Sequence, residues 1–238
     1  MMSNYNIFKA LHLEEKELIH SAMIAAIISK DDNRKSFFKM LNDCLTNELN
    51  KTIVKEPSKF RLIDLEKSID IENKGNKWID TEVHLLEKIP TSNTTRDRGR
   101  ADIWIGTNKK DAKKKYRLII ENKINAGNQY RQLRRYYRYL TETRTSETEI
   151  HREYAGLFFL CVKGDKNDRD KAEASAKPFN SESDGKKGIP TVYAIITYKD
   201  IIGWLEEVIL ETKEGDFKTA VQQYKTILED FYPKAKAK

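Results

Sequence analysis

Three short segments between residues 100 and 140 carry the side chains on which we expect the chemistry of this chain to depend. They are Arg100-Ala-Asp102, Leu118-Ile-Ile-Glu121-Asn-Lys123 and Gln132-Leu-Arg-Arg-Tyr-Tyr137. Two carboxylates that converge from neighbouring segments would provide the oxygen ligands that a hard cation such as Mg²⁺ prefers. A lysine beside them would then hold or polarise an attacking water.

Both carboxylates lie in or directly after segments that we predict to be short strands. Residues 118–120 have the β-branched character and length of a buried strand, and Asp102 belongs to a second apolar segment, 101–105. Side chains alternate along a strand, so Glu121 and Lys123 should point to one face and Asn122 to the other. If the two strands are neighbours, Asp102 joins Glu121 and Lys123 on that face.

The pattern Glu-x-Lys at a strand end is common, and it usually marks a solvated edge or a weak ion pair. The chain has another copy, Glu72-Asn73-Lys74, which Gly75 follows in what should be a turn. The copy at 121–123 differs because it follows three apolar residues, comes after a strand with Asp102 and leads into a helix with Gln132. We therefore expect the later copy to be the functional one.

The composition is that of a soluble globular protein with a heavily charged surface, since 39% of the 238 residues are hydrophobic and 34% are charged. We expect a single domain over 1–238, with a polar insertion at 163–190 that is either a flap or disordered. No apolar run would cross a membrane and the N-terminus lacks the order of a signal peptide, which favours the cytoplasm. Cys44 and Cys161 should be buried thiols rather than a disulfide or a zinc site.

The net charge of +7 is concentrated around the candidate site. Between residues 96 and 140 there are 14 Lys or Arg and 4 Asp or Glu, a local charge of +10, so the rest of the chain sums to −3. Such a basic region suits the binding of a polyanion. Part of it, Lys109, Lys110 and 113–115, should only form a solvated hairpin tip.

The arginines of this region form two groups. A loop at 90–100 brings Arg96, Arg98 and Arg100 beside Asp102. A helix expected at 127–140 has an apolar seam at Tyr130, Leu133, Tyr137 and Leu140, and beside it a basic stripe of Arg131, Arg134, Arg135 and Arg138. Interleaved arginine and tyrosine suit phosphate and base contacts, although a helix packed on one side and solvated on the other has the same pattern.

The remaining elements should support this site. We expect helices at 14–29, 34–49 and 217–231, a helix that a capping box opens at Thr197, a hairpin of 68–72 and 78–86, and strands at 155–162 and 191–197. Glu17 would usually be an exposed first-turn residue that the helix dipole favours. His20 should pack or form a hydrogen bond rather than bind a metal. One solvated strand face should carry Asp80, Glu82 and His84. Among these three, Glu82 is the best candidate for an auxiliary ligand.

These residues resemble the PD-(D/E)XK nuclease superfamily, whose core is a helix, three strands, a helix and a further strand. Asp102 is similar to the Asp of the motif, Glu121-Asn122-Lys123 to its E-x-K, and Gln132 to a Gln that some branches carry on the following helix. Glu17-Leu-Ile-His20-Ser21 and Ala126-Gly127-Asn128-Gln129 resemble motifs of one bacterial branch. The residue before Asp102 is Ala101, whereas the motif of the superfamily is written with Pro at this position; this departure is frequent in the superfamily. The similarity runs from about residue 14 to 140 and is weaker beyond.

The resemblance implies an α/β fold with a restriction-endonuclease-like αβββαβ core, in which helices flank a mixed central sheet, and extra C-terminal helices. It also implies a metal-dependent nuclease that hydrolyses phosphodiester bonds of nucleic acid, DNA more than RNA. Asp102 and Glu121 would bind Mg²⁺ or Mn²⁺ and Lys123 would orient the water. Gln132 and Glu17 would position the lysine and a second metal or water.

Two alternatives stay open. One is a catalytically inactive subunit on the same scaffold that binds nucleic acid or serves assembly, although binding alone does not require buried carboxylates facing a polyanion. The other is a soluble protein without a nucleic-acid role. The sequence is compatible with a homodimer, and it leaves restriction, repair and phage defence open as biological settings.

Overall fold

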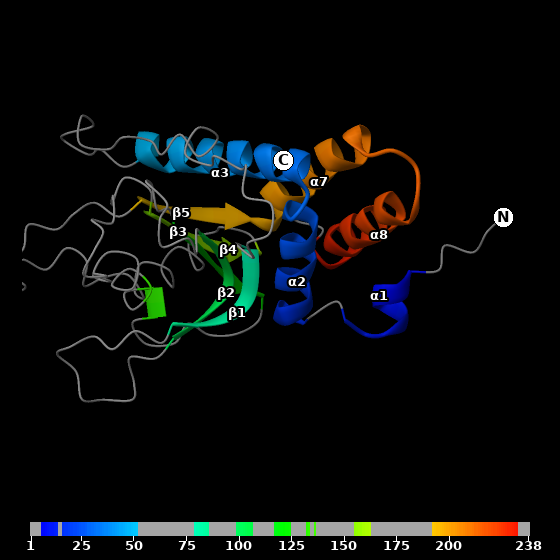
Figure 1. The fold of residues 1–238 in the computed structure, drawn as a ribbon, viewed down its shortest axis with the longest axis horizontal. Coiled ribbons are helices and arrows are strands. Elements are labelled where there is room, and N and C mark those ends of the chain that lie inside the picture. The colour runs from blue at the N-terminus through cyan, green and yellow to red at the C-terminus, as the bar shows by residue number, and fades with distance from the viewer. Residues whose placement is uncertain are drawn as a thin grey trace, which may run out of the picture.

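A five-stranded mixed sheet forms the centre of the computed structural model (Figure 1). The structure describes residues 6–13, 16–51, 79–85, 99–106, 117–124, 132–133, 136, 155–162 and 192–232. The strands lie in chain order across the sheet: β1 (Ile79–Leu85), β2 (Gly99–Gly106), β3 (Arg117–Lys123), β4 (Ala155–Cys161) and β5 (Val192–Thr197). The first three are antiparallel neighbours, whereas β3, β4 and β5 run parallel. The predicted α/β fold with a mixed sheet is thereby confirmed.

Four of these strands lie within two residues of their predicted bounds at either end. The fifth, β3, is longer than predicted, because it extends through Glu121 to Lys123. β1 falls in the segment predicted at 78–86, and it pairs with β2. Its predicted hairpin partner at 68–72 lies outside the described residues. Because β2 and β3 are neighbours, as expected, Asp102 and Glu121 come from adjacent strands.

Three helices cover one face of the sheet: α2 (Glu17–Ile28), α3 (Asp31–Lys51) and α7 (Tyr198–Glu211) (Figure 1). The larger hydrophobic core lies between them and alternate strand residues, among them Ile103, Ile105, Leu118, Ile120, Phe158 and Leu160. Period-two alternation along the strands sends these side chains to the same side. The helices therefore bury one face of the sheet completely at its centre.

The opposite face carries a second, smaller core. Trp104, Ile119, Leu157 and Phe159 pack there with Leu133 and Tyr136, which belong to a helical segment that the structure describes at 132–133 and 136. Leu133 is a member of the predicted apolar seam; the other members, Tyr130, Tyr137 and Leu140, lie outside the described residues. Burial on both faces explains why the parallel strands are continuous apolar runs.

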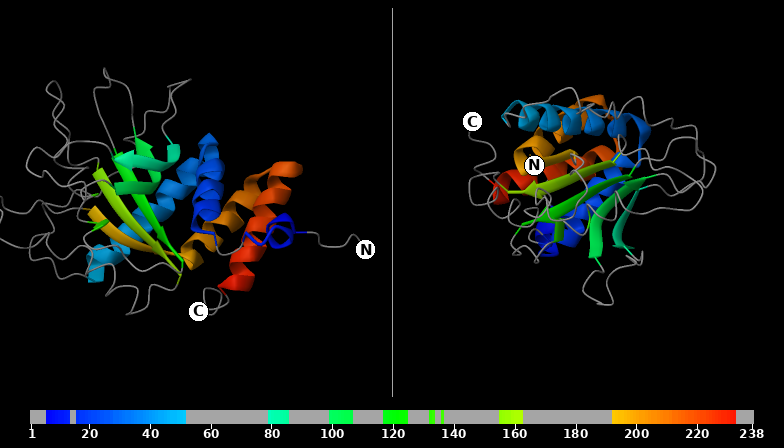
Figure 2. Two further views of the ribbon diagram at one scale, coloured as in Figure 1. Left: turned by 90° about the horizontal axis from the view of Figure 1, so that it is seen from below. Right: turned by 90° about the vertical axis from the view of Figure 1, so that its left-hand side faces the viewer.

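The remaining helices form an outer layer. α8 (Asp216–Phe231) packs on α7 away from the sheet, and α1 (Ile7–Ala10) packs on α8 (Figure 2). The capping box at Thr197 is confirmed, since its hydroxyl accepts from the Asp200 N–H and the Asp200 carboxylate accepts from the Thr197 N–H. In the part of the chain that is described, no helix is long and apolar enough to cross a bilayer.

Two predicted helix starts differ from the structure. The first helix begins at Glu17 and not at residue 14, because Lys16 has an extended backbone and serves as its N-cap. The second begins at Asp31, three residues earlier than predicted, and its Phe38 and Leu41 are buried as expected. Cys44 and Cys161 are also buried, as expected. The predicted insertion at 163–190 lies outside the described residues.

Candidate active site

Asp102 lies where regular pairing between β2 and β3 stops. The described pairing runs from Gly106 opposite Arg117 to Ile103 opposite Ile120. Two residues beyond Ile120 on β3, the N–H of Asn122 donates to Asp102 Oδ2 at 2.7 Å. A side-chain carboxylate thus replaces the backbone acceptor, and the two strands can separate at this point without leaving that N–H unpaired.

Pairing on the other side of β2 is also interrupted at Asp102. Thr81 pairs with Ile103 and Val83 with Ala101, but Glu82 between them has a φ of 57°. The register is the same before and after, so no residue is inserted. Asp102 therefore lies at the one position of β2 where the ladder is irregular on both sides.

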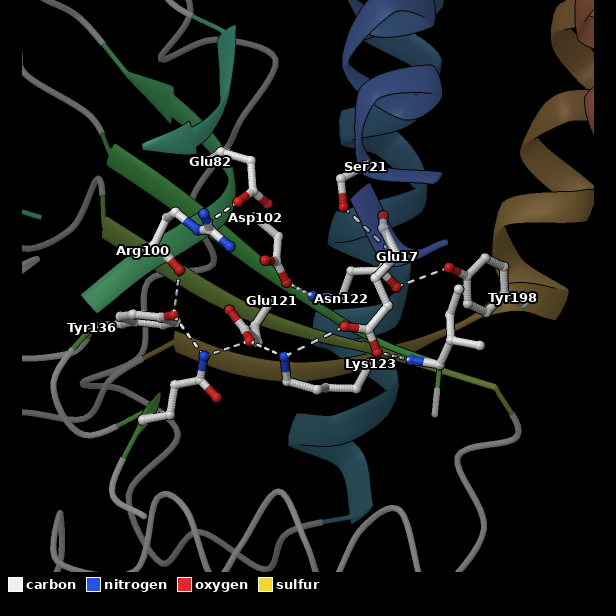
Figure 3. A network of polar contacts seen from close by, with 12 residues as sticks. Glu17, Ser21, Glu82, Arg100, Asp102, Glu121, Asn122, Lys123, Tyr136 and Tyr198 are labelled. Atoms are coloured by element: carbon white, nitrogen blue, oxygen red, sulfur yellow. Dashed lines mark hydrogen bonds and ion pairs between the residues drawn. The ribbon is translucent and has the colours of Figure 1, made fainter. Parts of the chain in front are cut away.

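Glu121 is the most deeply buried acid of the site, with 1% of its surface exposed. Its Oε1 accepts from Lys123 Nζ at 2.5 Å and from Gln132 Nε2 at 2.6 Å (Figure 3). Its Oε2 is buried and has no hydrogen-bond partner among the described residues. A buried carboxylate oxygen is costly unless a donor or a cation faces it, so this oxygen fits a metal ligand.

Tyr136 fixes the orientation of the Gln132 amide. The Tyr136 hydroxyl donates to the carbonyl oxygen of Arg100 at 2.6 Å and accepts from Gln132 Nε2 at 2.8 Å. Because that single proton is directed to the carbonyl, the hydroxyl can only accept from Gln132, and the NH₂ group therefore faces Glu121. Tyr136 was not among the site residues predicted from the sequence; its spacing of four residues from Gln132 on a helix was the available signal.

Asn122 points to the opposite face of β3 and ties the strand to two helices. Its Nδ2 donates to the Glu17 carbonyl oxygen and to Ser21 Oγ, both at 3.2 Å, while its Oδ1 accepts from the Tyr198 hydroxyl at 2.8 Å. The side chain is fully buried. The middle residue of the Glu-Asn-Lys motif therefore positions α2 and α7 against the end of β3.

Glu17 reaches the end of β3 from α2. Its Oε1 accepts from the Ile124 N–H at 2.7 Å, and its Oε2 lies 4.0 Å from Lys123 Nζ. Glu17 is therefore half-buried rather than an ordinary exposed first-turn carboxylate, because the anchor at Asn122 brings the start of α2 against the strand. His20 is buried, and its Nδ1 lies 3.2 Å from the Tyr224 hydroxyl, as expected for a packing and hydrogen-bonding residue.

Burial and nearby negative charge raise the pKa of both acids. The pKa of Asp102 rises to about 6, mainly through burial, although Lys123 and the Asn122 N–H oppose the rise. The pKa of Glu121 rises to about 8, through burial first and the charge of Asp102 second. Burial lowers the pKa of Lys123, but the neighbouring acids, Glu121 above all, outweigh it and the net direction is upward. A further positive charge would lower the free-energy cost of ionising both acids beside a single lysine.

The structure thus brings together Asp102, Glu121, Lys123, Gln132 and Glu17, with Arg100 beside them. Asp80 is exposed, and its Oδ1 accepts from the Thr81 N–H, so it takes no part. The sequence predicted a solvated face for Glu82; its side chain is only 24% exposed, and it forms an ion pair with Arg100 that alternation along the strand did not predict. The side chain of His84 lies outside the described residues, as do the other predicted nucleic-acid contacts: Arg96, Arg98, Arg131, Arg134 and Arg138.

The residues present fit a divalent cation. Among the described residues, no three His, Cys, Asp or Glu are grouped to hold a metal ion. Two convergent carboxylates nevertheless suffice for Mg²⁺, which keeps several waters and takes further oxygens from substrate phosphates. Such a cation would pair with Glu121 Oε2, which has no hydrogen-bond partner in the described part of the chain, and would lower the raised pKa values of both acids.

A mixed sheet with these residues gathered at the break in its antiparallel half defines a restriction-endonuclease-like α/β protein. A family model described as the PD-(D/E)XK nuclease superfamily matches residues 5–231, and the chain belongs to this superfamily. No curated protein and no solved structure matched it significantly. The family suggests nuclease activity on nucleic acid, and nucleases of this superfamily generally use divalent metals.

Proposed function

We propose that this protein is a metal-dependent nuclease that hydrolyses phosphodiester bonds, with Mg²⁺ or Mn²⁺ as the cofactor. The observation that carries the proposal is the buried Glu121 carboxylate next to Asp102, which has one oxygen on Lys123 and the other without a hydrogen-bond partner among the described residues. A protein that merely bound nucleic acid would gain nothing from a buried acid, Glu121, and a half-buried acid, Asp102, facing a polyanion. This observation favours the enzyme over the inactive binding or assembly subunit.

Asp102 and Glu121 would hold the cation, which when bound lowers the pKa of a coordinated water and offsets the charge that builds on the phosphorus oxygens. Lys123 would orient the attacking water, because Glu121 holds its ammonium beside the two acids. Gln132 would keep the Glu121 carboxylate in place through its NH₂ group. Glu17 would hold Lys123 from the other side and anchor the end of β3.

DNA is the substrate that a restriction-endonuclease-like core favours. The basic region at 96–140, with its local charge of +10, would supply the sequence-independent part of the affinity. Arg96, Arg98, Arg100, Arg131, Arg134 and Arg138 are the proposed phosphate contacts. We further propose that the protein acts in the cytoplasm as a single domain.

Cleavage assays with variants of the two acids test the proposal. Supercoiled plasmid, linear duplex, single strands and RNA would be incubated with Mg²⁺, Mn²⁺ or EDTA. We expect cleavage of DNA that EDTA abolishes and that Asp102→Ala and Glu121→Ala lose by at least about 100-fold, as is usual when a group that stabilises developing charge is removed. Asp80→Ala, an exposed acid on the neighbouring strand, is the matched control and should cut normally.

Calorimetry with Mn²⁺ separates the enzyme from its rivals. Metal binding by the native protein that both variants lose supports the assignment. Salt-dependent DNA binding without cleavage or metal binding would indicate the inactive subunit. A protein that binds neither DNA nor metal would have no nucleic-acid role.

A further inference from the structure

Glu82 has an unfavourable backbone conformation in the middle of a strand. Its φ of 57° lies in the left-handed region, which side chains other than glycine rarely adopt. Among the described residues, His12 is the only other such case, and it lies in the turn after α1. Conformations of this kind persist only where surrounding structure holds them, and they gather at functional sites.

The Glu82 side chain makes a specific contact with Arg100. Its Oε2 lies 2.5 Å from Arg100 Nε, and the two side chains are 24% and 58% exposed (Figure 3). An ion pair this open to water contributes little to stability, too little to explain the strained backbone by itself. The pair is therefore better explained by what it positions than by the stability it adds.

Arg100 is held at its backbone as well as at its side chain. Its carbonyl oxygen accepts from the Tyr136 hydroxyl, which also contacts Gln132, the residue that binds Glu121. Arg100 and Asp102 are two residues apart on β2, so their side chains emerge on the same face. Arg100 is thus held by Tyr136 at its backbone and by Glu82 at its guanidinium, while more than half of the side chain stays open to solvent.

We propose that Arg100 contacts a non-bridging oxygen of the phosphate that is cleaved, and that Glu82 is the positioning residue that aims its guanidinium. The proposal deepens the nuclease function above and rests on it. Glu82 occupies the Nε side of the guanidinium, which leaves terminal N–H groups for a phosphate oxygen. The guanidinium stays protonated throughout, so it stabilises charge on the phosphoryl group and transfers no proton.

Single-turnover cleavage separates this role from metal binding and from DNA affinity. We expect Glu82→Gln to slow cleavage by about 10–100-fold, because small misplacements of a charge-stabilising group have effects of that size. Its Mn²⁺ affinity by calorimetry and its DNA affinity in Ca²⁺ should stay within about threefold of native values, since the variant keeps Asp102, Glu121 and the arginine itself. Glu214→Gln, which removes the acid of the ion pair with Lys218 on α8, is the matched control and should cut at the native rate.

Chemical rescue tests the dependence of Arg100 on Glu82 directly. Guanidinium chloride at millimolar concentration should restore part of the rate of Arg100→Ala, with NaCl at equal ionic strength as the control. The same guanidinium should not restore Glu82→Gln/Arg100→Ala, because no carboxylate is left to hold it. The two single substitutions should also be non-additive, with the double variant no slower than the slower single variant by more than about threefold.

Three results would overturn the inference while leaving the nuclease in place: native-rate cleavage by Glu82→Gln, rescue that is independent of Glu82, or a loss of Mn²⁺ binding in Glu82→Gln that matches the loss of rate. The last would make Glu82 a metal ligand. A native protein that cuts no nucleic acid with any metal would overturn the proposed function as well.

Discussion

Asp102 and Glu121 place two acids, the first half-buried and the second buried, beside a single lysine ammonium. Their raised pKa values mean that the folded, metal-free protein holds these protons more tightly than the unfolded chain does. The residues that would bind a cation are therefore a source of instability without it. This is the usual relation between a functional site and the stability of the protein that carries it.

The pH dependence of stability follows from these shifts. The ordinary pKa of Glu121 is 4.5 and its folded value is about 8, so the unfolded chain releases the proton first as pH rises. In EDTA, the free energy of unfolding should therefore fall between about pH 4.5 and pH 8, with Asp102 adding to the fall between 3.8 and about 6. Urea denaturation across this range measures it.

Glu121→Gln is the control for that dependence because it has the same shape and does not ionise. Relative to the native protein, it should gain at least about 1.4 kcal/mol between pH 5 and pH 8, the equivalent of one pKa unit. Saturating Mg²⁺ should stabilise the native protein but not the variant. Parallel curves for the two proteins would show that Glu121 ionises normally in the folded state.

At the scale of the elements, Asn122 determines where α2 meets the sheet. The Tyr198 hydroxyl from the start of α7 donates to the Asn122 oxygen, and the amide nitrogen donates to Glu17 and Ser21 of α2. Glu17 lies on that turn and reaches Lys123 and the Ile124 N–H only because the helix begins there. Three elements from distant parts of the chain thus place one carboxylate.

Tyr198→Phe should weaken this arrangement. It leaves the buried Asn122 oxygen without its donor, which costs about 1–3 kcal/mol, and it should also lower the cleavage rate through Glu17. Tyr224→Phe removes an equally buried hydroxyl that faces His20, so it should cost similar stability and leave the rate unchanged. Equal effects of the two substitutions on the rate would contradict a positioning role for Asn122.

Strand context should also distinguish the two Glu-Asn-Lys tripeptides. The copy at 121–123 ends a buried strand beside Asp102, and a metal ligand or water-positioning ammonium lost there should cost orders of magnitude in rate. Glu121→Ala/Lys123→Ala should therefore not cut plasmid, whereas Glu72→Ala/Lys74→Ala should cut like the native protein. Residues 72–74 lie outside the described structure, so the assay is a direct test of the sequence argument. The reverse result would move the active site to the other tripeptide.

At the scale of the whole molecule, the basic charge and the acidic site serve different steps of the proposed reaction. The region at 96–140 carries +10, whereas the rest of the chain carries −3. Attraction of a polyanion to one region raises the association rate and orients the substrate, while a cation in the site relieves the repulsion between phosphate and carboxylates. Lysines and arginines that do not contact the acids can therefore supply affinity without taking part in the chemistry.

Replacing Arg131, Arg134 and Arg138 with Gln tests that division. Binding should weaken about equally for all DNA sequences, and the slope of log affinity against log salt should flatten by up to about one unit for each lost phosphate contact. The exposed residues Lys9, Lys35 and Lys213, changed to Gln together, remove the same charge elsewhere and should leave the slope nearly unchanged. Fluorescence anisotropy at several salt concentrations measures both. A native slope in the arginine variant would place the stripe away from the substrate.

Local pattern in the sequence was sufficient for most of the fold. Period-two alternation placed Glu121 and Lys123 on one face of a buried strand, and the Thr197–Asp200 capping box marked the start of α7. The family resemblance supplied the mixed sheet and the neighbouring position of Asp102. The short helix α1 was not predicted, since a single turn has too few residues to show a period.

Contacts across long stretches of chain were decided only by the tertiary structure. Asn122 and Glu17 are 105 residues apart and Tyr136 and Arg100 are 36 apart, so no spacing in the sequence relates them. The sequence predicted a solvated strand face for Glu82 because alternation assumes a regular strand. Its left-handed backbone and its ion pair with Arg100 exist only where β1 meets β2 at Asp102. Periodicity depends on neighbours along the chain, which the sequence contains directly. The direction of the Glu17 carboxylate depends instead on the hydrogen bonds that α2 forms with Asn122 and the Ile124 N–H at the end of β3. These partners meet only when the helix packs on the sheet.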